Sequence, residues 1–154
     1  MVSGRSCANM AVFYLVTLAR QVQRVSACGL ARDGDAVLLV QIGRSAYGDA
    51  GKWMLPGGGI EHGEDPKEAV IRSFAEQIGL TVQVDELLEV GSDYRHLAGG
   101  IDFHGIFIVY GVTITAGDLR AEPDGAVLSP TWVKPTEVDA LPVLETLRPV
   151  LARR

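Results

Sequence analysis

A glycine-rich turn followed by an amphipathic helix holds the residues of this 154-residue chain that could do chemistry. The turn contains three successive glycines, Gly57–Gly59, and the helix after it carries the acid Glu76. Glycine has no Cβ, so the backbone of such a turn can approach a ligand or a metal ion closely. Magnesium prefers oxygen ligands, and once held it can neutralise phosphate charge and place a water for attack. A segment of this kind could hold such an ion between a backbone carbonyl and the carboxylate of Glu76.

The helix has clear start and stop signals in the sequence. Asp65 stands at the N-cap with Pro66 after it, and Glu68, three residues beyond the cap, completes a capping box. Gly79 ends the helix. One face is apolar at helical spacing and is expected to pack on a sheet, with Val70, Ile71, Phe74, Ala75 and Ile78. The opposite face is left for chemistry and carries Arg72, Ser73, Glu76 and Gln77.

The turn and helix together resemble the Nudix box of the MutT-like hydrolases. That pattern is Gly, five residues, Glu, seven residues, then Arg-Glu-apolar-any-Glu-Glu-any-Gly-apolar. The residues at the required positions are Gly58, Glu64, Arg72, Phe74, Glu76, Gly79 and Leu80. Leu55-Pro56 before the glycines and Trp132-Val133 further on support the match. The resemblance implies an α/β (α+β) fold of the Nudix type, an α/β/α sandwich with a mixed, partly antiparallel β-sheet.

The resemblance also implies roles for individual residues. Arg72, Glu76 and Glu64 are the expected catalytic residues, with Arg72 orienting the acidic face and Glu64 tying the loop to the helix. The expected metal is Mg²⁺ or Mn²⁺. Its expected ligands are the carbonyl of Gly57 together with Glu76, Gln77 and Ser73 at the three cluster positions of the box.

The box is degenerate, because two of its three clustered acids are replaced by Ser73 and Gln77. Neutral oxygens recover little of the cost of dehydrating a hard divalent cation, so we expect weak metal binding, with substrate phosphates supplying more of the ligands. The resemblance implies a hydrolase that cleaves a nucleoside diphosphate linked to another moiety. The alternative is a catalytically silent nucleotide-binding or interaction module. Other acids that could complete the site or act as base are Asp102, Glu122 and Asp124.

A second set of residues is expected to bind the small nucleotide substrate. Arg44, Tyr47 and Trp53 flank the loop before the glycines, where a base could stack and a phosphate could be held. Tyr94 and Arg95 could likewise face a substrate. These five residues are the sequence's candidates for substrate binding.

The remaining elements are expected to be mostly strands. Residues 25–31 and 36–42 form a hairpin around Asp33-Gly34, whose types suit a tight turn. Further strands are expected at 53–56, 81–90, 101–115 and 127–133, with a helical turn at 137–141 and a terminal helix at 143–151.

Length and charge limit the other possibilities. A chain of this size suits one domain with a hydrophobic core, and a net charge of −5 without a Lys/Arg run argues against binding a nucleic acid polymer. Cys7 and Cys28 have neither metal-site nor redox spacing, which favours a reducing cytoplasm.

The N-terminal segment is apolar over residues 11–19. This run is too short to span a bilayer, and we expect no membrane association. Polar residues after it interrupt the pattern of a signal peptide. We therefore expect residues 1–23 to be an extension, an extra strand or helix that could pair two subunits into a homodimer, and residues 24–154 to be the Nudix-like domain.

Overall fold

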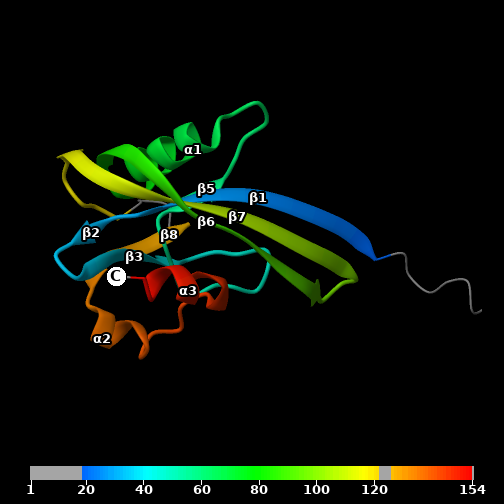
Figure 1. Cartoon of the computed structure of the whole chain (residues 1–154). Helices are drawn as coiled ribbons and strands as arrows, with labels where there is room; N and C mark the ends of the chain where they lie inside the picture. The colour runs from blue at the N-terminus through cyan, green and yellow to red at the C-terminus, as the bar shows by residue number, and fades with distance from the viewer. Residues whose placement is uncertain (1–18, 122–125, 154) are drawn as a thin grey trace, which may run out of the picture.

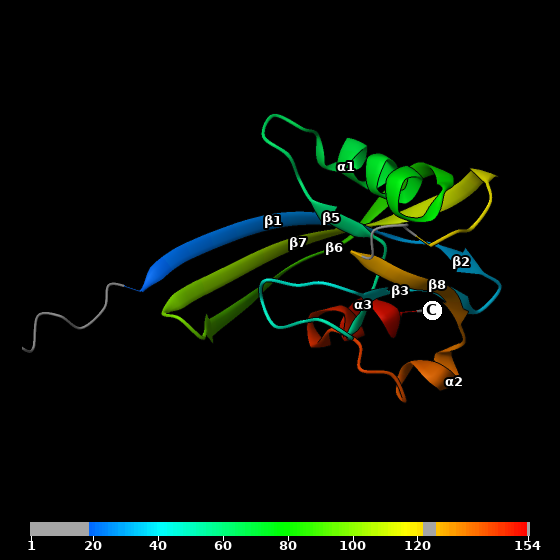
Figure 2. The same cartoon turned by 180° about the vertical axis from the view of Figure 1, so that it is seen from behind.

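The computed structural model describes residues 19–121 and 126–153, whose strands form two sheets flanked by helices (Figure 1). Helix α1 (Pro66–Ser73) lies on one side of the sheets, while α2 (Pro135–Val138) and α3 (Arg148–Leu151) lie on the other (Figure 2). The mixed sheet with few helices confirms the predicted α+β fold class.

The first sheet has the strand order β5-β1-β7-β6. Its strands are β5 (Gly57–Gly59), β1 (Arg20–Leu30), β7 (Ile101–Gly117) and β6 (Leu80–Leu97). β1 and β7 are parallel, whereas β1 with β5 and β6 with β7 are antiparallel. This sheet carries the glycine turn at one edge.

Two strands of the first sheet are longer than the sequence predicts. The prediction that the strand ends at residue 90 is wrong, because the polar stretch after Gly91 pairs with β7 as far as Leu97 with Ile101. β1 begins at Arg20, so the expected extension of residues 1–23 overlaps the strand over its last four residues. Cross-strand backbone pairing holds both segments, and their own composition does not reveal it.

The second sheet has the order β2-β3-β4, and β8 pairs with β3. Its strands are β2 (Arg32–Asp33), β3 (Ala36–Ile42), β4 (Trp53–Met54) and β8 (Val127–Val133), all antiparallel to their neighbours. Asp33 pairs with Ala36 across a turn in which Gly34 has a φ of 60°. The predicted turn is confirmed, with positive φ supplied by the glycine, but the predicted pairing of residues 25–31 with 36–42 is wrong: only Arg32 and Asp33 pair with β3, and β1 pairs with β5 and β7 in the first sheet.

The box helix has the predicted N-cap, Asp65, but changes its hydrogen-bond pattern before it ends. The Asp65 side chain accepts from the N–H of Lys67, which caps α1. After Ser73 the chain continues as a π-helical turn, η3 (Phe74–Ile78). Gly79, with a φ of 74°, donates its N–H to the carbonyl of Phe74 five residues back. Such π turns are frequent at functional sites.

The C-terminal helix is shorter than predicted. Val143 forms a β-bridge with Trp53, and a 3₁₀ turn, η4 (Glu145–Leu147), precedes α3. The N–H of Trp53 donates to Pro142 and its carbonyl accepts from Leu144, so residues 142–144 are extended instead of helical.

Two apolar clusters hold these layers together. Phe74 and its neighbours Val70 and Ile78 are fully buried against the sheets. The other cluster lies under the C-terminal turns and includes Leu39, Leu55, Val143, Leu147 and Val150. The first cluster presses the box helix onto the sheets and thereby fixes the helix beside the glycine turn. In the described residues, no helix combines the length and apolarity needed to cross a bilayer.

Candidate functional site

The glycine turn lies against β1 with no room for a side chain. Gly57 pairs with Cys28, and a Cβ on Gly57 would lie 2.3 Å from the carbonyl oxygen of Ala27. Any larger residue would have to push two backbones apart. The position of the Gly57 carbonyl is therefore set by the sheet itself.

Glu64 and Arg72 connect the loop to the helix. Arg72 donates from Nε to Glu64 Oε1 at 2.7 Å and from Nη2 to Glu64 Oε2 at 2.9 Å, and it also reaches the Gly59 carbonyl at 3.2 Å. The same carboxylate accepts from the N–H of Glu61 at 2.9 Å. The hydrogen bonds from Arg72, followed by that from Glu61, lower the pKa of Glu64 to about 2. Glu64 ties the loop to the helix as expected; its catalytic role stays a prediction.

Glu76 lies beside Arg72. Its carboxylate oxygen is 3.6 Å from Nη1 of Arg72, and its side chain is 65% exposed. A pair this exposed contributes little to stability because water screens it. The only acid left in the cluster positions therefore faces solvent beside Arg72.

Ser73 and Gln77 are the two cluster residues that face the glycine turn. Gln77 donates from Nε2 to the carbonyl of Gly57 at 3.0 Å. A carbonyl accepts and never donates, so the NH₂ end of the amide must point at it. Ser73 is 1% exposed, and a Cβ built on Gly58 would lie 3.6 Å from both Ser73 Oγ and Gln77 Nε2.

The groups around the glycine turn are not a suitable set of ligands for a Mg²⁺ ion held by the chain alone. The amide of Gln77 lies against the Gly57 carbonyl, where the cation was expected, and the nearby oxygens, Ser73 Oγ and Gln77 Oε1, are buried, neutral and without a hydrogen-bond partner among the described residues. The expected fourth ligand, Glu76, is exposed and lies beside Arg72. Within the described residues, no three His, Cys, Asp or Glu side chains are grouped to hold a metal. Neutral oxygens do not offset the dehydration of a divalent cation.

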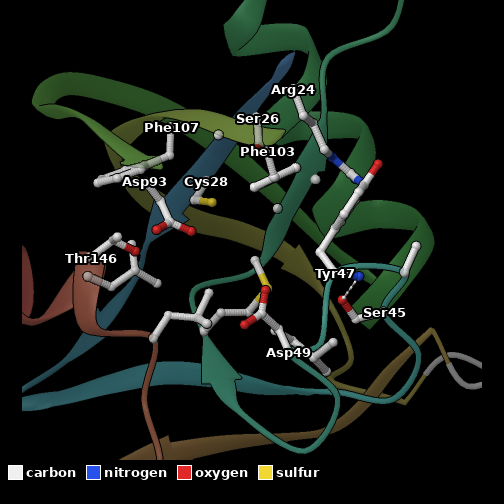
Figure 3. A pocket seen from close by; sticks show the side chains of 18 of the residues that line it. Arg24, Ser26, Cys28, Ser45, Tyr47, Asp49, Asp93, Phe103, Phe107 and Thr146 are labelled. Carbon is white, nitrogen blue, oxygen red and sulfur yellow. Dashed lines mark hydrogen bonds between the residues drawn. The ribbon is translucent and has the colours of Figure 1, made fainter. Parts of the chain in front are cut away.

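A pocket of about 360 Å³ opens beside the box (Figure 3). One wall is a single face of the first sheet, because alternate residues of a strand point the same way. These residues are Arg24, Ser26 and Cys28 of β1, Phe103 and Phe107 of β7, and Asp93 and Arg95 of β6. Gly57, Gly58 and Gln77 lie at the edge, which joins the pocket to the box.

The opposite wall is the loop 43–52, which is tied to β6 by charges. Arg95 makes two hydrogen bonds to the carboxylate of Asp49, at 3.0 and 2.9 Å, and Lys52 adds a third at 3.0 Å. Arg95 Nε also lies 2.6 Å from Asp93. Burial alone would raise the pKa of Asp49, but the hydrogen bonds from Arg95 and Lys52 outweigh it and lower that pKa. Arg95 lines the pocket as expected, yet its guanidinium holds the loop.

Two aromatic residues that line the pocket, Tyr47 and Phe103, pack against each other. The rings of Tyr47 and Phe103 lie 4.3 Å apart and 31° from parallel. Arg95 lies over Phe103 at 5.3 Å from its centroid, and Arg24 lies 5.9 Å from that of Tyr47. Flat apolar faces next to cations suit a nucleobase.

Arg44 and Tyr47 line the pocket as the sequence predicts, whereas two other candidates do not. Trp53 packs in the C-terminal apolar cluster. Tyr94 lies between the pocket residues of β6, so it points to the other face, where it is 60% exposed and donates to Asp102 at 3.0 Å. Trp53 and Tyr94 do not line this pocket, and a substrate-binding role for them stays a prediction.

Asp102, one of the acids proposed as an alternative base, does not line the pocket either. Asp102 lies with Tyr94 on the outer face of the sheet, where His96 is its second partner. Glu122 and Asp124 lie outside the described residues. Sequence reasoning missed Arg24, Phe103 and Phe107, although the alternation along β1 and β7 carried the signal.

Cys28 is the one pocket residue with a thiol. Burial raises its pKa to about 12, although the charge of Arg24 opposes the shift. A thiol this weakly acidic stays protonated and makes a poor nucleophile. Cys28 therefore contributes to the shape of the pocket and not to covalent chemistry.

Comparison with known proteins agrees with this arrangement. The NUDIX domain model matches residues 21–153, and the chain belongs to the Nudix family. A MutT-like protein of Streptomyces ambofaciens is 34% identical over 90 residues, which cover 58% of this chain and 53% of the relative. An ADP-ribose pyrophosphatase of Methanocaldococcus jannaschii is 33% identical over 100 residues, covering 65% and 56%. The chain thus spans about half the length of these relatives.

A solved structure shows the same fold at full-domain scale. The MutT protein of Bacillus halodurans superimposes with a TM-score of 0.67 at 28% identity, over 84% of this chain and 80% of that one. Family membership confirms the resemblance read from the box. The chain is a Nudix domain whose relatives include pyrophosphohydrolases.

Proposed function

We propose that this Nudix domain binds a nucleoside diphosphate linked to another moiety in the pocket between the first sheet and the loop 43–52. The observation that carries the proposal is the continuity of the pocket, from the Tyr47–Phe103 rings to the turn at Gly57–Gly58. The rings suit the base, and the glycine backbone leaves space for phosphates next to it. A relative named ADP-ribose pyrophosphatase supports this ligand class.

Hydrolysis of the diphosphate is the second candidate function. The pair of Glu64 and Arg72, with Glu76 beside it, favours it, since this part of the box is intact. The neutral residues Ser73 and Gln77 oppose it, because they remove the charge that would hold a metal. We propose that any turnover is much slower than in a relative with a complete box.

Calorimetry with a panel of nucleotide sugars, dinucleotides and triphosphates tests the first proposal. At least one compound is expected to bind, and Tyr47→Ala is expected to weaken it by about tenfold, the effect of losing one stacking contact. Tyr94→Ala is the matched control, because Tyr94 lies on the other face of β6. Failure of every compound to bind, or equal losses in both variants, would contradict the proposal.

Release of phosphate or of a nucleoside monophosphate from the same panel tests hydrolysis. Product formed in Mg²⁺ or Mn²⁺ and abolished by Glu76→Gln would support the enzyme. Binding with no product from any compound would leave a binding module. The double variant Ser73→Glu and Gln77→Glu supplies the two acids that the box lacks, and it is then expected to raise the rate of metal-dependent hydrolysis.

The location and assembly of the domain are also proposals. A cytoplasmic location is supported by the buried free thiol of Cys28, which a reducing compartment preserves. A homodimer through the apolar segment at residues 11–19 rests on the sequence alone, because all of that segment except Ala19 lies outside the described residues. Sedimentation of a chain that starts at Ala19 tests it, and an unchanged oligomer would refute it.

A further inference from the structure

The hydrogen bond between Gln77 and Gly57 occupies the carbonyl at which a metal ion was expected to neutralise phosphate charge. Gln77 Nε2 donates to the carbonyl at 3.0 Å, which ties the helix to the turn by a neutral hydrogen bond. The turn is also fixed from behind by its pairing with β1. Both attachments are complete without an ion, so the turn needs no metal to hold its shape.

A diphosphate bound beside this turn still needs a positive partner, because an anion is costly to bury unpaired. Three charged residues of the pocket pair with one another, since Asp49 and Asp93 both contact Arg95. Two carboxylates and one guanidinium together carry a net negative charge, which cannot attract a phosphate. The other two cations that line the pocket are Arg24 and Arg44, and Arg24 is the one whose guanidinium lies beside the glycine turn.

Arg24 is placed to be that cation. A Cβ built on Gly59 would lie 3.2 Å from Nη2 of Arg24, so the guanidinium runs alongside the glycine turn. The same group approaches the ring of Tyr47 at 5.9 Å from its centroid (Figure 3). Arg24 thus stands between the turn, where phosphates fit, and the aromatic surface, where a base fits.

We propose that this domain holds the diphosphate of its ligand without a metal ion, using the guanidinium of Arg24 in place of the cation that the Gln77 amide has displaced from the Gly57 carbonyl. The inference rests on the proposed function, since it concerns the same pocket. A guanidinium presents two parallel N–H groups to a phosphate and keeps its charge at every physiological pH. Arg24 is therefore a binding residue that also orients the diphosphate along the turn.

Calorimetry with ADP and with inorganic pyrophosphate, in EDTA and then in Mg²⁺, tests this inference on the full chain. Both probes are expected to bind in EDTA. Arg24→Gln is expected to weaken binding by about 10- to 100-fold, the effect of one charge-assisted hydrogen bond, while Arg24→Lys recovers part of it. Arg20→Gln is the matched control, since Arg20 is on the same strand and face but outside the pocket.

The outcomes separate this inference from the proposed function. Binding of ADP only in Mg²⁺ would overturn the inference and leave the proposed function standing. Equal losses in Arg24→Gln and Arg20→Gln would also overturn it, because the effect would then be one of net charge. Absence of binding by both probes and by the whole nucleotide panel would remove both proposals. A circular dichroism spectrum that matches the starting protein confirms that Arg24→Gln is folded.

Discussion

Replacing Gln77 with glutamate tests whether an amide has taken the place of a metal ion. The variant loses the N–H that donates to the Gly57 carbonyl and puts a carboxylate about 3 Å from that oxygen. A buried acceptor left without its donor costs about 1 to 3 kcal/mol. For a domain of this size each kcal/mol lowers Tm by about 2 to 4 °C, so Gln77→Glu is expected to lose about 2 to 12 °C in EDTA.

Adding Mn²⁺ is expected to restore much of that loss in the variant. A cation can bridge the new carboxylate and the Gly57 carbonyl, and at a hundredfold excess over its Kd it stabilises the folded state by about 2.7 kcal/mol. This corresponds to a rise of roughly 5 to 11 °C in Tm. The starting protein, whose carbonyl is already paired, is expected to respond far less.

Differential scanning calorimetry in EDTA and in Mn²⁺ measures both effects. Gln77→Leu is the control, because it removes the same donor without adding a charge and should fall in Tm without responding to metal. The reasoning is refuted if the starting protein gains as much from Mn²⁺ as Gln77→Glu does. It is equally refuted if Gln77→Glu is as stable as the starting protein in EDTA.

Three other changes probe the elements that position the site. The pKa of Glu64 is lowered from 4.5 to about 2, so the stability that its ionised carboxylate contributes to the folded state is complete above pH 4.5 and is lost as pH falls towards 2. In Glu64→Gln, Tm should therefore depend less on pH over that interval. Asp49→Ala should lower the free energy of unfolding by up to about 3 kcal/mol, which is the low end for a buried ion pair because Arg95 is partly exposed. Amide hydrogen exchange in the loop 43–52 should become faster. Phe74→Ala should cost about 3 to 5 kcal/mol in urea unfolding, since the ring is fully buried; a smaller loss would place the box helix outside the core.

The sequence predicts the elements whose signals are local. Asp65 and Gly79 bound the box helix because a cap and a positive-φ residue act within a few positions. The hairpin at Gly34 follows from the same kind of short-range chemistry. The second half of β6 could not be predicted in this way, because its polar residues are held by pairing with a strand that follows them.

The site was only partly predictable for the same reason. Tyr94 and Arg95 are neighbours with similar sequence signals, and only the register with β7 decides which of them faces the pocket. The cluster expected at positions 73, 76 and 77 assumes a regular α-helix, whereas the structure has a π turn there. In this turn Gln77 donates to the carbonyl of Gly57, and Glu76 is exposed beside Arg72.

The hydrogen bond between Gln77 and Gly57 has a consequence for what the domain can sense. An amide neither titrates nor dissociates, so this fastening does not vary with acidity, chelators or the supply of free magnesium. The occupancy of a binding site fastened in this way would depend on the concentration of its nucleotide alone. The occupancy of a site that requires a metal ion would depend on the concentrations of both the nucleotide and the metal.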